Sequence, residues 1–162
     1  MKAIILSAGK GTRLGKYTSE LPKGMLNFLG LSIIERQIGI YRECEINNIS
    51  VVGGYKAEKI KLDRVKLYIN KDYDKTNMVE SLFCSKDEFD DDLIVSYSDI
   101  LFKASVLRGL KQSTADVTVT VDSDWQEYWS ARYGRVDFDL EGLELDGDRI
   151  KKSATLIHLL KQ

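Results

Sequence analysis

Two glycines and two cations lie close together in the first loop of the chain. Residues 6–14 read LSAGKGTRL and follow an apolar run, and Pro22 and Lys23 come after them. Glycine lets backbone N–H groups approach a phosphate, and the charges of Arg13 and Lys23 can neutralise phosphate oxygens. We therefore predict that this loop binds a polyphosphate.

Two familiar phosphate-binding motifs do not fit this loop. A P-loop has four residues between its first glycine and its Gly-Lys pair, whereas five residues lie between Gly9 and Gly15. The residue after Lys16 is Tyr17, where a P-loop has Ser or Thr. A dinucleotide-binding fingerprint would place a glycine at Leu14 and an acidic residue after the second strand, where the sequence reads GGY. Neither motif therefore explains the loop.

Carboxylates and aromatic residues follow two later apolar runs. Asp99 comes after residues 93–97, and a carboxylate at the end of a strand can hold Mg²⁺ against a triphosphate. Asp122 and Asp124 follow residues 117–121, and the aromatic residues next to them are Trp125, Tyr128, Trp129 and Tyr133. Carboxylates and ring faces together can stabilise a cationic group. The alternatives are a turn cap for Asp99 and, for the aromatic residues, packing in the core or against the second subunit of a homodimer.

Apolar runs of strand length alternate with helical patterns along the chain. The runs are rich in branched residues and lie at residues 3–6, 49–52, 65–69, 93–97 and 117–121. Apolar residues recur at helical spacing in residues 33–41, 78–89 and 106–110. Thr76 is the expected cap of the second helix. This alternation predicts an α/β domain with a mostly parallel central sheet that binds ligands at the carboxyl ends of its strands.

The last part of the chain departs from this alternation. Residues 136–145 read as strand and turn, and the Asp-Gly-Asp sequence at 146–148 is typical of a hairpin turn. We therefore predict a C-terminal hairpin. With 162 residues and 43% hydrophobic content, the chain fits one domain over residues 1–162 built around one core.

The composition also bears on partners and location. The 24 basic and 25 acidic residues nearly balance, so we do not expect nucleic acid as a partner. The early apolar stretch is too short for a signal sequence, and none reaches the roughly 20 residues of a membrane span. Cys44 and Cys84 lie in helical patterns without metal-ligand spacing, so we expect both to be reduced and buried. Together these features predict a cytoplasmic protein that is not bound to a membrane.

The first loop resembles the signature of the sugar-nucleotidyltransferase superfamily. That signature is Gly-x-Gly-x-Arg-Leu with a downstream Pro-Lys, which stand here as GKGTRL and PK. Gly54 and Tyr55 after the second strand, and Asn70 at the end of the third, also match the family. The resemblance implies a Rossmann-like nucleotidyltransferase domain that uses Mg²⁺ bound by Asp99. The residues to which it gives a role in nucleotide binding or catalysis are Leu6, Ala8, Gly9, Gly11, Arg13, Lys23 and Asp99.

Two further segments resemble cytidylyltransferases within that superfamily. Residues 76–82, TNMVESL, resemble the helix start of members that use CTP, which implies that Asn77 and Ser81 lie near the base. The alternative is that these two residues only cap and continue a helix. The aromatic segment resembles enzymes that act on small phospho- or phosphono-compounds with an amine, such as phosphocholine or 2-aminoethylphosphonate. The residues implied to bind this acceptor are Asp122, Asp124, Trp125, Tyr128 and Trp129.

The implied reaction transfers CMP from CTP, or the nucleotide of another NTP, to the acceptor and releases pyrophosphate. The resemblance covers residues 1–152, and residues 153–162 form an atypical tail. Family domains run further and supply a second metal-binding carboxylate, for which this sequence offers no candidate. Two alternatives therefore stay open: a hexose-1-phosphate nucleotidyltransferase, and a truncated nucleotide-binding protein with weak or no catalysis.

Overall fold

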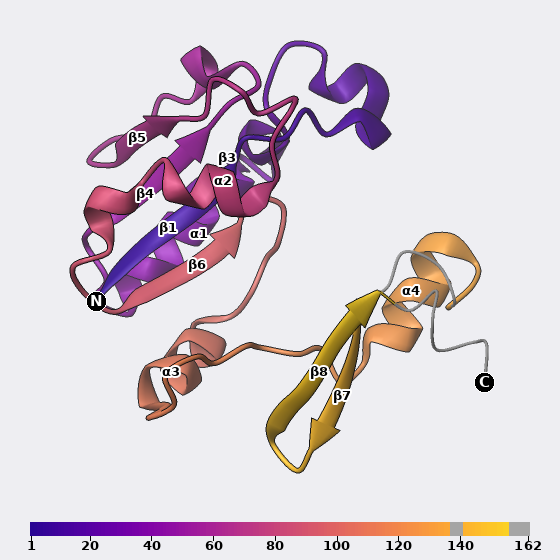
Figure 1. Ribbon diagram of the computed structural model, residues 1–162. Coiled ribbons are helices and arrows are strands. Elements are labelled where there is room, and N and C mark those ends of the chain that lie inside the picture. Colours follow the sequence, from indigo (N-terminus) through magenta and orange to yellow (C-terminus); the bar gives the residue numbers. More distant parts are fainter. Residues whose placement is uncertain (137–140, 156–162) are drawn as a thin grey trace. The chain divides into compact units, whose positions relative to one another are not determined.

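The computed structural model describes residues 1–136 and 141–155 (Figure 1). The chain forms two compact units, Met1–Thr118 and Val119–Gln162. The expectation that residues 1–162 act as one nucleotidyltransferase domain stays a prediction. Residues 156–162, most of the expected atypical tail, lie outside the described residues. In the part of the chain that the structure describes, no helix has the length and apolar character needed to cross a membrane.

The first unit is built around four parallel strands in the order β5-β4-β1-β6. Their bounds are Lys2–Ser7 for β1, Ile49–Gly53 for β4, Lys66–Ile69 for β5 and Leu93–Tyr97 for β6. In the middle of the sheet, Ile5 of β1 is paired with Val51 of β4 and with Ser96 of β6. Because all four strands run the same way, the loops after them meet at one edge of the sheet. The predicted α/β fold with a parallel sheet is confirmed.

Helices cover both faces of this sheet. Successive residues of a strand point to opposite sides, so these mainly apolar strands have two apolar faces to cover. Helices α1 (Ile33–Glu43) and α3 (Ala104–Gln112) pack on one face. The buried side chains of that face are Ala3, Ile5, Ile34, Ile38, Tyr41, Cys44, Ile46, Ile49, Val51, Ile60, Ile94 and Leu107. Helix α2 (Met78–Phe83) covers the other face through Leu82, which packs against Ile4 and Val52. Figure 1 shows α2 in front of the sheet and α1 behind it.

Short elements fill the connections of the first unit. The 3-10 helices are η1 (Thr12–Thr18), η2 (Lys23–Met25), η3 (Ala57–Lys59) and η4 (Lys86–Glu88), and a small antiparallel pair is formed by β2 (Asn27–Phe28) and β3 (Leu31–Ser32). Helix α1 begins with a capping box. The Ser32 hydroxyl accepts from Glu35 N at 3.2 Å, and Ser32 N donates to Glu35 Oε2 at 2.7 Å. These bonds lower the pKa of Glu35 and fix the first turn of α1.

The second unit contains helix α4 (Trp125–Tyr133) and the antiparallel strands β7 (Glu141–Asp146) and β8 (Arg149–Thr155). Gly147, with φ of +59°, lies in the turn between the two strands. Glycine adopts this backbone conformation without the steric cost of a Cβ. The predicted C-terminal hairpin is thus confirmed, although residues 137–140 of its expected first strand lie outside the described residues.

The strand predicted at residues 117–121 is wrong. These residues form no strand, and the side chains of Val117, Val119 and Val121 are 83%, 55% and 59% exposed. Branched residues favour a strand where a neighbouring strand and a packed face receive them, and these valines have neither. Asp122 and Asp124 therefore follow a segment without regular secondary structure, not a strand end.

Three smaller predictions also differ from the structure. Asn77, not Thr76, caps α2 by accepting from Val79 N and Glu80 N. The helical pattern of residues 78–89 is divided between α2 and η4. Cys44 is buried as expected, but Cys84 is exposed. Local hydrogen bonding and the limits of the packed face decide these three features, and apolar spacing alone does not reveal either.

Candidate functional site at the carboxyl edge of the sheet

The loops after β1, β4 and β6 are joined by backbone hydrogen bonds. Tyr55 N donates to Ala8 O at 2.9 Å, and Ser98 N donates to Leu6 O at 3.0 Å. A Cβ on Gly54 would lie 2.7 Å from Ala8 O, so only glycine allows this approach. Leu6 and Ala8 are both buried and offer backbone atoms rather than side chains to the site. The Gly-Tyr pair noticed in the sequence thus closes the loop of β1 against the loop of β4.

The glycine-rich loop is held from its inner side. Gly11 has φ of +63° and directly precedes η1. The Thr18 hydroxyl lies 3.2 Å from the carbonyl oxygens of both Gly11 and Gly15, to which it donates, and Tyr55 OH donates to Thr18 O at 3.0 Å. On the outer side Gly9 is exposed, and a Cβ there would meet nothing within 4 Å. The backbone near Gly9 is therefore supported from below and open to a ligand.

Positive charge predominates in this loop. Residues 8–19 include Lys10, Arg13 and Lys16 and contain no acidic residue. Arg13 is an exposed residue of η1, and the Lys10 ammonium lies over the ring of Tyr55, 5.8 Å from its centroid. A concentration of one charge sign on an exposed loop attracts ligands of the opposite sign. The electrostatics of the loop therefore suit an anion.

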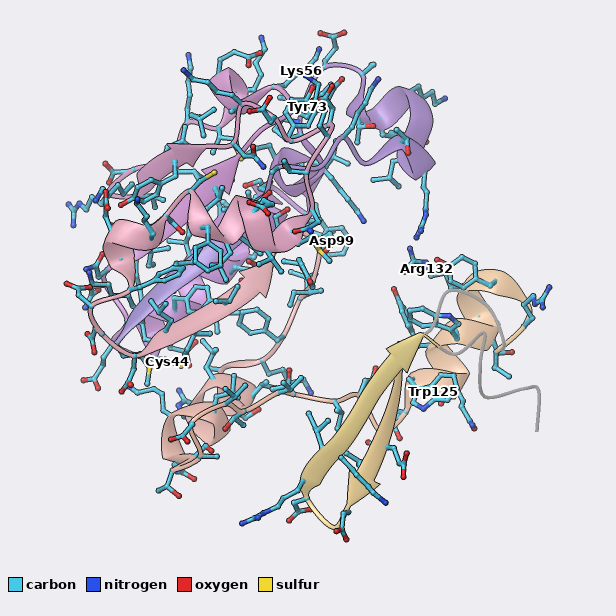
Figure 2. All side chains as sticks on the ribbon, in the orientation of Figure 1. Cys44, Lys56, Tyr73, Asp99, Trp125 and Arg132 are labelled. Atoms are coloured by element: carbon cyan, nitrogen blue, oxygen red, sulfur yellow. The ribbon has the colours of Figure 1, made fainter. Side chains whose placement is uncertain are left out.

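Two of the predicted catalytic residues form an ion pair at this edge. Lys23 of η2 donates from Nζ to Oδ2 of Asp99. Asp99 follows β6 and is labelled in Figure 2. The two side chains are 30% and 36% exposed. A Cβ on Gly11 would lie 3.3 Å from Cβ of Lys23, so the glycine loop lies directly against this lysine. The structure thus brings together Gly11, Lys23 and Asp99, which lie far apart in the sequence.

Gly24 is a site residue that the sequence reasoning missed. A Cβ on Gly24 would lie 2.7 Å from both Cδ1 of Ile34 and Cβ of Ser98, which is closer than packed atoms tolerate. Pro22, just before this turn, is fully buried. The turn that carries Lys23 is therefore pressed between α1 and the residue next to Asp99. The signal in the sequence was the glycine immediately after the Pro-Lys pair.

Asp99 is the carboxylate at this site that could hold a metal ion. Among residues 1–136 and 141–155, no group of three or more His, Cys, Asp or Glu residues is arranged to hold a metal. Mg²⁺ often takes only one or two carboxylates and completes its octahedron with water and substrate phosphates. Asp99 fits that mode, because its carboxylate is partly exposed at the edge where a polyphosphate would bind.

The residues predicted to lie near the base form an internal network. Asn70, which is 4% exposed, donates from Nδ2 to Thr76 Oγ1 and to Ser81 Oγ, both at 2.9 Å. Asn77 Oδ1 accepts from Val79 N at 2.9 Å as the cap of α2. Ser81 is buried and is one of the partners of Asn70, so its hydroxyl already has a structural role. Contact of Asn77 or Ser81 with a base stays a prediction.

The predicted acceptor-binding residues belong to the second unit. Trp125, Tyr128 and Trp129 lie on α4, which contains no buried residue. The ring centroids of Tyr128 and Trp129 are 5.5 Å apart, and the Arg132 guanidinium lies over Trp129 at 5.7 Å. Figure 2 shows Trp125 and Arg132 on this helix. A cation of the chain therefore contacts part of this aromatic cluster, which consists of Trp125, Tyr128, Trp129 and Tyr133.

The two aspartates before α4 are the other residues predicted to bind the acceptor. Asp122 Oδ1 accepts from Asp124 N at 2.9 Å, and both residues are exposed. Asp124 precedes α4 as its cap residue but makes no side-chain capping bond. Binding of an acceptor by these carboxylates stays a prediction.

Comparisons with known proteins agree with this geometry. Residues 3–153 match the family model of the MobA-like NTP transferase domain. The chain is 37% identical over 156 residues to the CTP:phosphoglutamine cytidylyltransferase of Campylobacter jejuni, covering 90% of this chain and 62% of that protein. It is 35% identical over 118 residues to the choline-phosphate cytidylyltransferase of Streptococcus pneumoniae, covering 70% of this chain and 52% of that protein.

A solved structure shows the same similarity in three dimensions. The CTP:phosphocholine cytidylyltransferase from Streptococcus pneumoniae superposes with a TM-score of 0.57 at 33% identity, covering 64% of this chain and 49% of that one. The chain thus spans about half to three-fifths of the length of these relatives. The resemblance first seen in the loop motif extends through residue 153.

Proposed function

The chain belongs to the MobA-like NTP transferase family, and we propose that it transfers CMP from CTP to a small phosphate or phosphonate that carries an amine, with release of pyrophosphate. The observation that carries the proposal is the Lys23–Asp99 ion pair, which lies against Gly11 at the carboxyl edge of a parallel sheet. This is the edge at which open α/β sheets bind their ligands.

The glycine loop provides the place for the triphosphate. The open backbone near Gly9 and the left-handed turn at Gly11 let phosphate oxygens approach N–H groups. Arg13 and Lys23 then stabilise the negative charge that builds up on the leaving pyrophosphate. An acceptor phosphate is already anionic near neutral pH, so its oxygen attacks the α-phosphorus without a general base. The main work of the protein is positioning and charge compensation.

The ion pair has a second consequence for the ligand-free protein. Lys23 neutralises Asp99 before any ligand arrives, so neither side chain is left as an unpaired charge at a half-buried edge. A bound triphosphate would offer Lys23 phosphate oxygens in place of the carboxylate, and Asp99 would then be the residue that holds Mg²⁺. When bound, Mg²⁺ supplies charge neutralisation for the phosphates. One pair of side chains thus serves both the empty and the occupied site.

The relatives guide the choice of acceptor. The two relatives described above are a phosphoglutamine and a choline-phosphate cytidylyltransferase, and both of these acceptors contain nitrogen as well as a phosphate. The aromatic cluster of α4 supports an acceptor with a cationic group, because Arg132 already lies over its rings. Since CTP is supplied in the cytoplasm, we also place the reaction there.

The proposal is tested by pyrophosphate release. CTP, UTP, ATP and dTTP are each combined with phosphocholine, 2-aminoethylphosphonate, phosphoglutamine and glucose 1-phosphate in the presence of Mg²⁺. We expect the fastest release with CTP and one of the amine- or amide-bearing acceptors. The double variant Lys23→Ala/Asp99→Asn is the matched blank, because release that persists in it does not come from this site.

Two outcomes would contradict the proposal. Faster release with UTP or dTTP and glucose 1-phosphate would assign the chain to the hexose-1-phosphate enzymes. Binding of CTP measured by calorimetry, without pyrophosphate release from any pair, would identify a nucleotide-binding protein that lacks catalysis.

A further inference from the structure

Gln37 is a fully buried polar residue in the apolar face of α1. Its neighbours on that face are Ile34, Ile38 and Tyr41, all buried in the core. A buried amide costs free energy unless its donors and acceptor are all bonded, and an aliphatic residue would fill the same place without that cost. A specific role for the amide is therefore to be sought in its hydrogen bonds.

The Gln37 amide binds the turn that carries Asp99. Nε2 donates to Tyr97 O at 2.8 Å and to Ile100 O at 2.6 Å, the carbonyls on either side of Ser98 and Asp99. On its other side, Oε1 accepts from Ser96 Oγ at 3.3 Å. All three bonds thus go to β6 or to the turn that follows it. The amide of Gln37 thus joins the two ends of a short backbone turn that contains Asp99.

Apart from Ser98, which is buried next to Gly24, the side chains of this turn provide little packing of their own. Ile100 and Leu101 are 42% and 52% exposed, and Asp99 is 36% exposed. Exposed segments with few buried apolar contacts open locally at low free-energy cost. The bonds from Gln37 therefore restrain a turn that its own side chains do not hold.

One face of α1 positions both members of the ion pair. Ile34 lies so close to Gly24 that a Cβ there would meet it at 2.7 Å, and Gly24 follows Lys23 directly. Gln37 lies three residues after Ile34, on the same face of the helix, and holds the turn of Asp99. The capping box at Ser32 and Glu35 fixes this first part of α1.

We propose that Gln37 is a positioning residue, which through Tyr97 O and Ile100 O sets the place of the Asp99 carboxylate relative to Lys23. The inference rests on the proposed function, in which Asp99 acts on the nucleotide and Mg²⁺. Gln37 itself touches neither ligand. Its removal should therefore loosen the Asp99 turn and weaken use of Mg²⁺ while the glycine loop stays intact.

The test uses three variants of the full chain. Gln37→Met removes the amide but keeps length and suits an apolar core, so it should fold. Ser96→Ala removes the bond to Oε1 and keeps both donors of Gln37. Ile38→Ala, on the same helix, creates a cavity in the core and removes no side-chain hydrogen bond, so it is the control for a general loss of stability.

Two readouts are measured on each variant. Amide hydrogen exchange is followed for residues 98–101, and the Mg²⁺ concentration that gives half-maximal pyrophosphate release is determined with CTP. For Gln37→Met we expect about tenfold faster exchange in this turn, with unchanged exchange in β1, and about a tenfold higher half-saturating Mg²⁺ concentration. Ser96→Ala should change both by less than about threefold. Ile38→Ala should lower the melting temperature and leave the half-saturating concentration unchanged.

Wild-type exchange at residues 98–101 in Gln37→Met would overturn the proposal, and so would an Ile38→Ala variant whose Mg²⁺ requirement rises as much as that of Gln37→Met. A wild-type protein that releases no pyrophosphate would contradict the proposed function instead. The exchange rates would still decide the role of Gln37, because they require no turnover.

Discussion

Both ends of the parallel sheet carry charged side chains, but the amino end is closed around its charge. Glu88 is 4% exposed, and its carboxylate accepts from Lys66 Nζ at 2.8 Å, Tyr68 Oη at 2.6 Å and Lys2 Nζ at 2.9 Å. Lys2 and Lys66 are the first residues of β1 and β5. Hydrogen bonds from Lys66, Tyr68 and Lys2 lower the pKa of Glu88 from 4.5 to about 2. The cluster ties η4 to the start of two strands and leaves the carboxylate no room for a ligand.

The carboxyl end is open by comparison. Asp99 pairs there with Lys23, and each side chain is about a third exposed beside the open loop at Gly9. A carboxylate surrounded by three donors stabilises the fold, whereas a carboxylate with one exchangeable partner can accept a new one. The number and the enclosure of its partners, not its charge alone, thus distinguish the structural carboxylate of Glu88 from that of Asp99, for which we propose a functional role. Substitutions at the carboxyl end should therefore lower turnover with little change in stability. Substitutions at the amino end should lower stability with little change in turnover.

Asp99→Asn should give the largest effect at the open end. The amide keeps the shape of the side chain but loses the charge, so kcat/KM for CTP should fall by about 10³-fold. The free energy of unfolding should change by less than about 1 kcal/mol, because the pair is partly exposed. Steady-state pyrophosphate release and chemical unfolding measure the two quantities. Asp63→Asn, at an ion pair that is 86% exposed on both sides, is the matched control and should change neither. Normal Mg²⁺-dependent turnover in Asp99→Asn would assign Asp99 to the turn alone.

Lys23→Ala and Arg13→Ala should each reduce turnover by about 10²-fold, the scale found when one preorganised charge is removed from a developing anion. The fold should be retained, which circular dichroism can verify. Lys61→Ala removes the same charge from another exposed loop of the first unit and should keep wild-type turnover. Near-normal turnover of either variant at saturating CTP would show that its cation does not act on the phosphates.

Glu88→Gln should have the opposite signature at the closed end. We expect the free energy of unfolding to fall by about 2 kcal/mol at pH 7, less than the full pKa shift implies because the Lys66 side chain is 59% exposed. Turnover at low temperature, where both proteins are folded, should stay within about twofold because the cluster lies at the other end of the sheet. Glu58→Gln, at an exposed position in η3, is the control for loss of one surface carboxylate.

The pH dependence of this difference gives a sharper test. Because the pKa of Glu88 is lower in the folded protein than its ordinary value of 4.5, the folded state binds the proton more weakly. The stabilisation is therefore complete above pH 4.5 and is lost as the pH falls toward 2. The unfolding free energies of wild type and Glu88→Gln should converge over this range. A difference that stays constant from pH 6 to pH 3 would show that the ionised carboxylate is not what stabilises the cluster.

Much of the parallel sheet could be predicted from the sequence. Its four strands lie within one or two residues of the apolar runs at 3–6, 49–52, 65–69 and 93–97, because parallel strands covered on both faces contain mainly apolar residues. The run at 117–121 has the same composition but forms no strand. Strand formation there depends on a neighbouring strand, which local composition does not reveal.

The residues of the candidate site could be predicted from the sequence, but their arrangement in space could not. The glycine loop, Lys23 and Asp99 stood out by type and spacing, whereas their pairing depends on how η2 and the end of β6 pack on α1. Gln37 carried no local signal, because a glutamine in a helical pattern usually indicates an exposed position. Only the backbone carbonyls that it reaches, 60 residues or more along the chain, reveal its place in the site.

On α4 of the second unit, a positive charge lies over aromatic rings, whereas at each of the two ends of the sheet a positive charge lies beside a carboxylate. Arg132 lies over Tyr133 at 4.9 Å and over Trp129 at 5.7 Å, while among the described residues no cation lies over Trp125. Trp125 is also only partly buried. Tyr128 shares these properties, but the indole of Trp125 offers the better ring face for a cation, so Trp125 is the residue to test.

Trp125→Ala should raise the KM for phosphocholine by about tenfold, corresponding to the 1 to 2 kcal/mol that a cation gains over an indole face. The KM for CTP should stay within about twofold, since CTP is expected at the loop of β1. Trp125→Phe keeps a ring face and should raise the acceptor KM by less than about threefold. Ethyl phosphate, which has no ammonium, should bind both variants and wild type alike. A core role for Trp125 predicts a different pattern, because a buried Trp→Ala change costs roughly 3 to 5 kcal/mol of stability. Equal weakening toward CTP and phosphocholine, together with a large fall in melting temperature, would therefore show that Trp125 supports the fold and does not select a cationic acceptor.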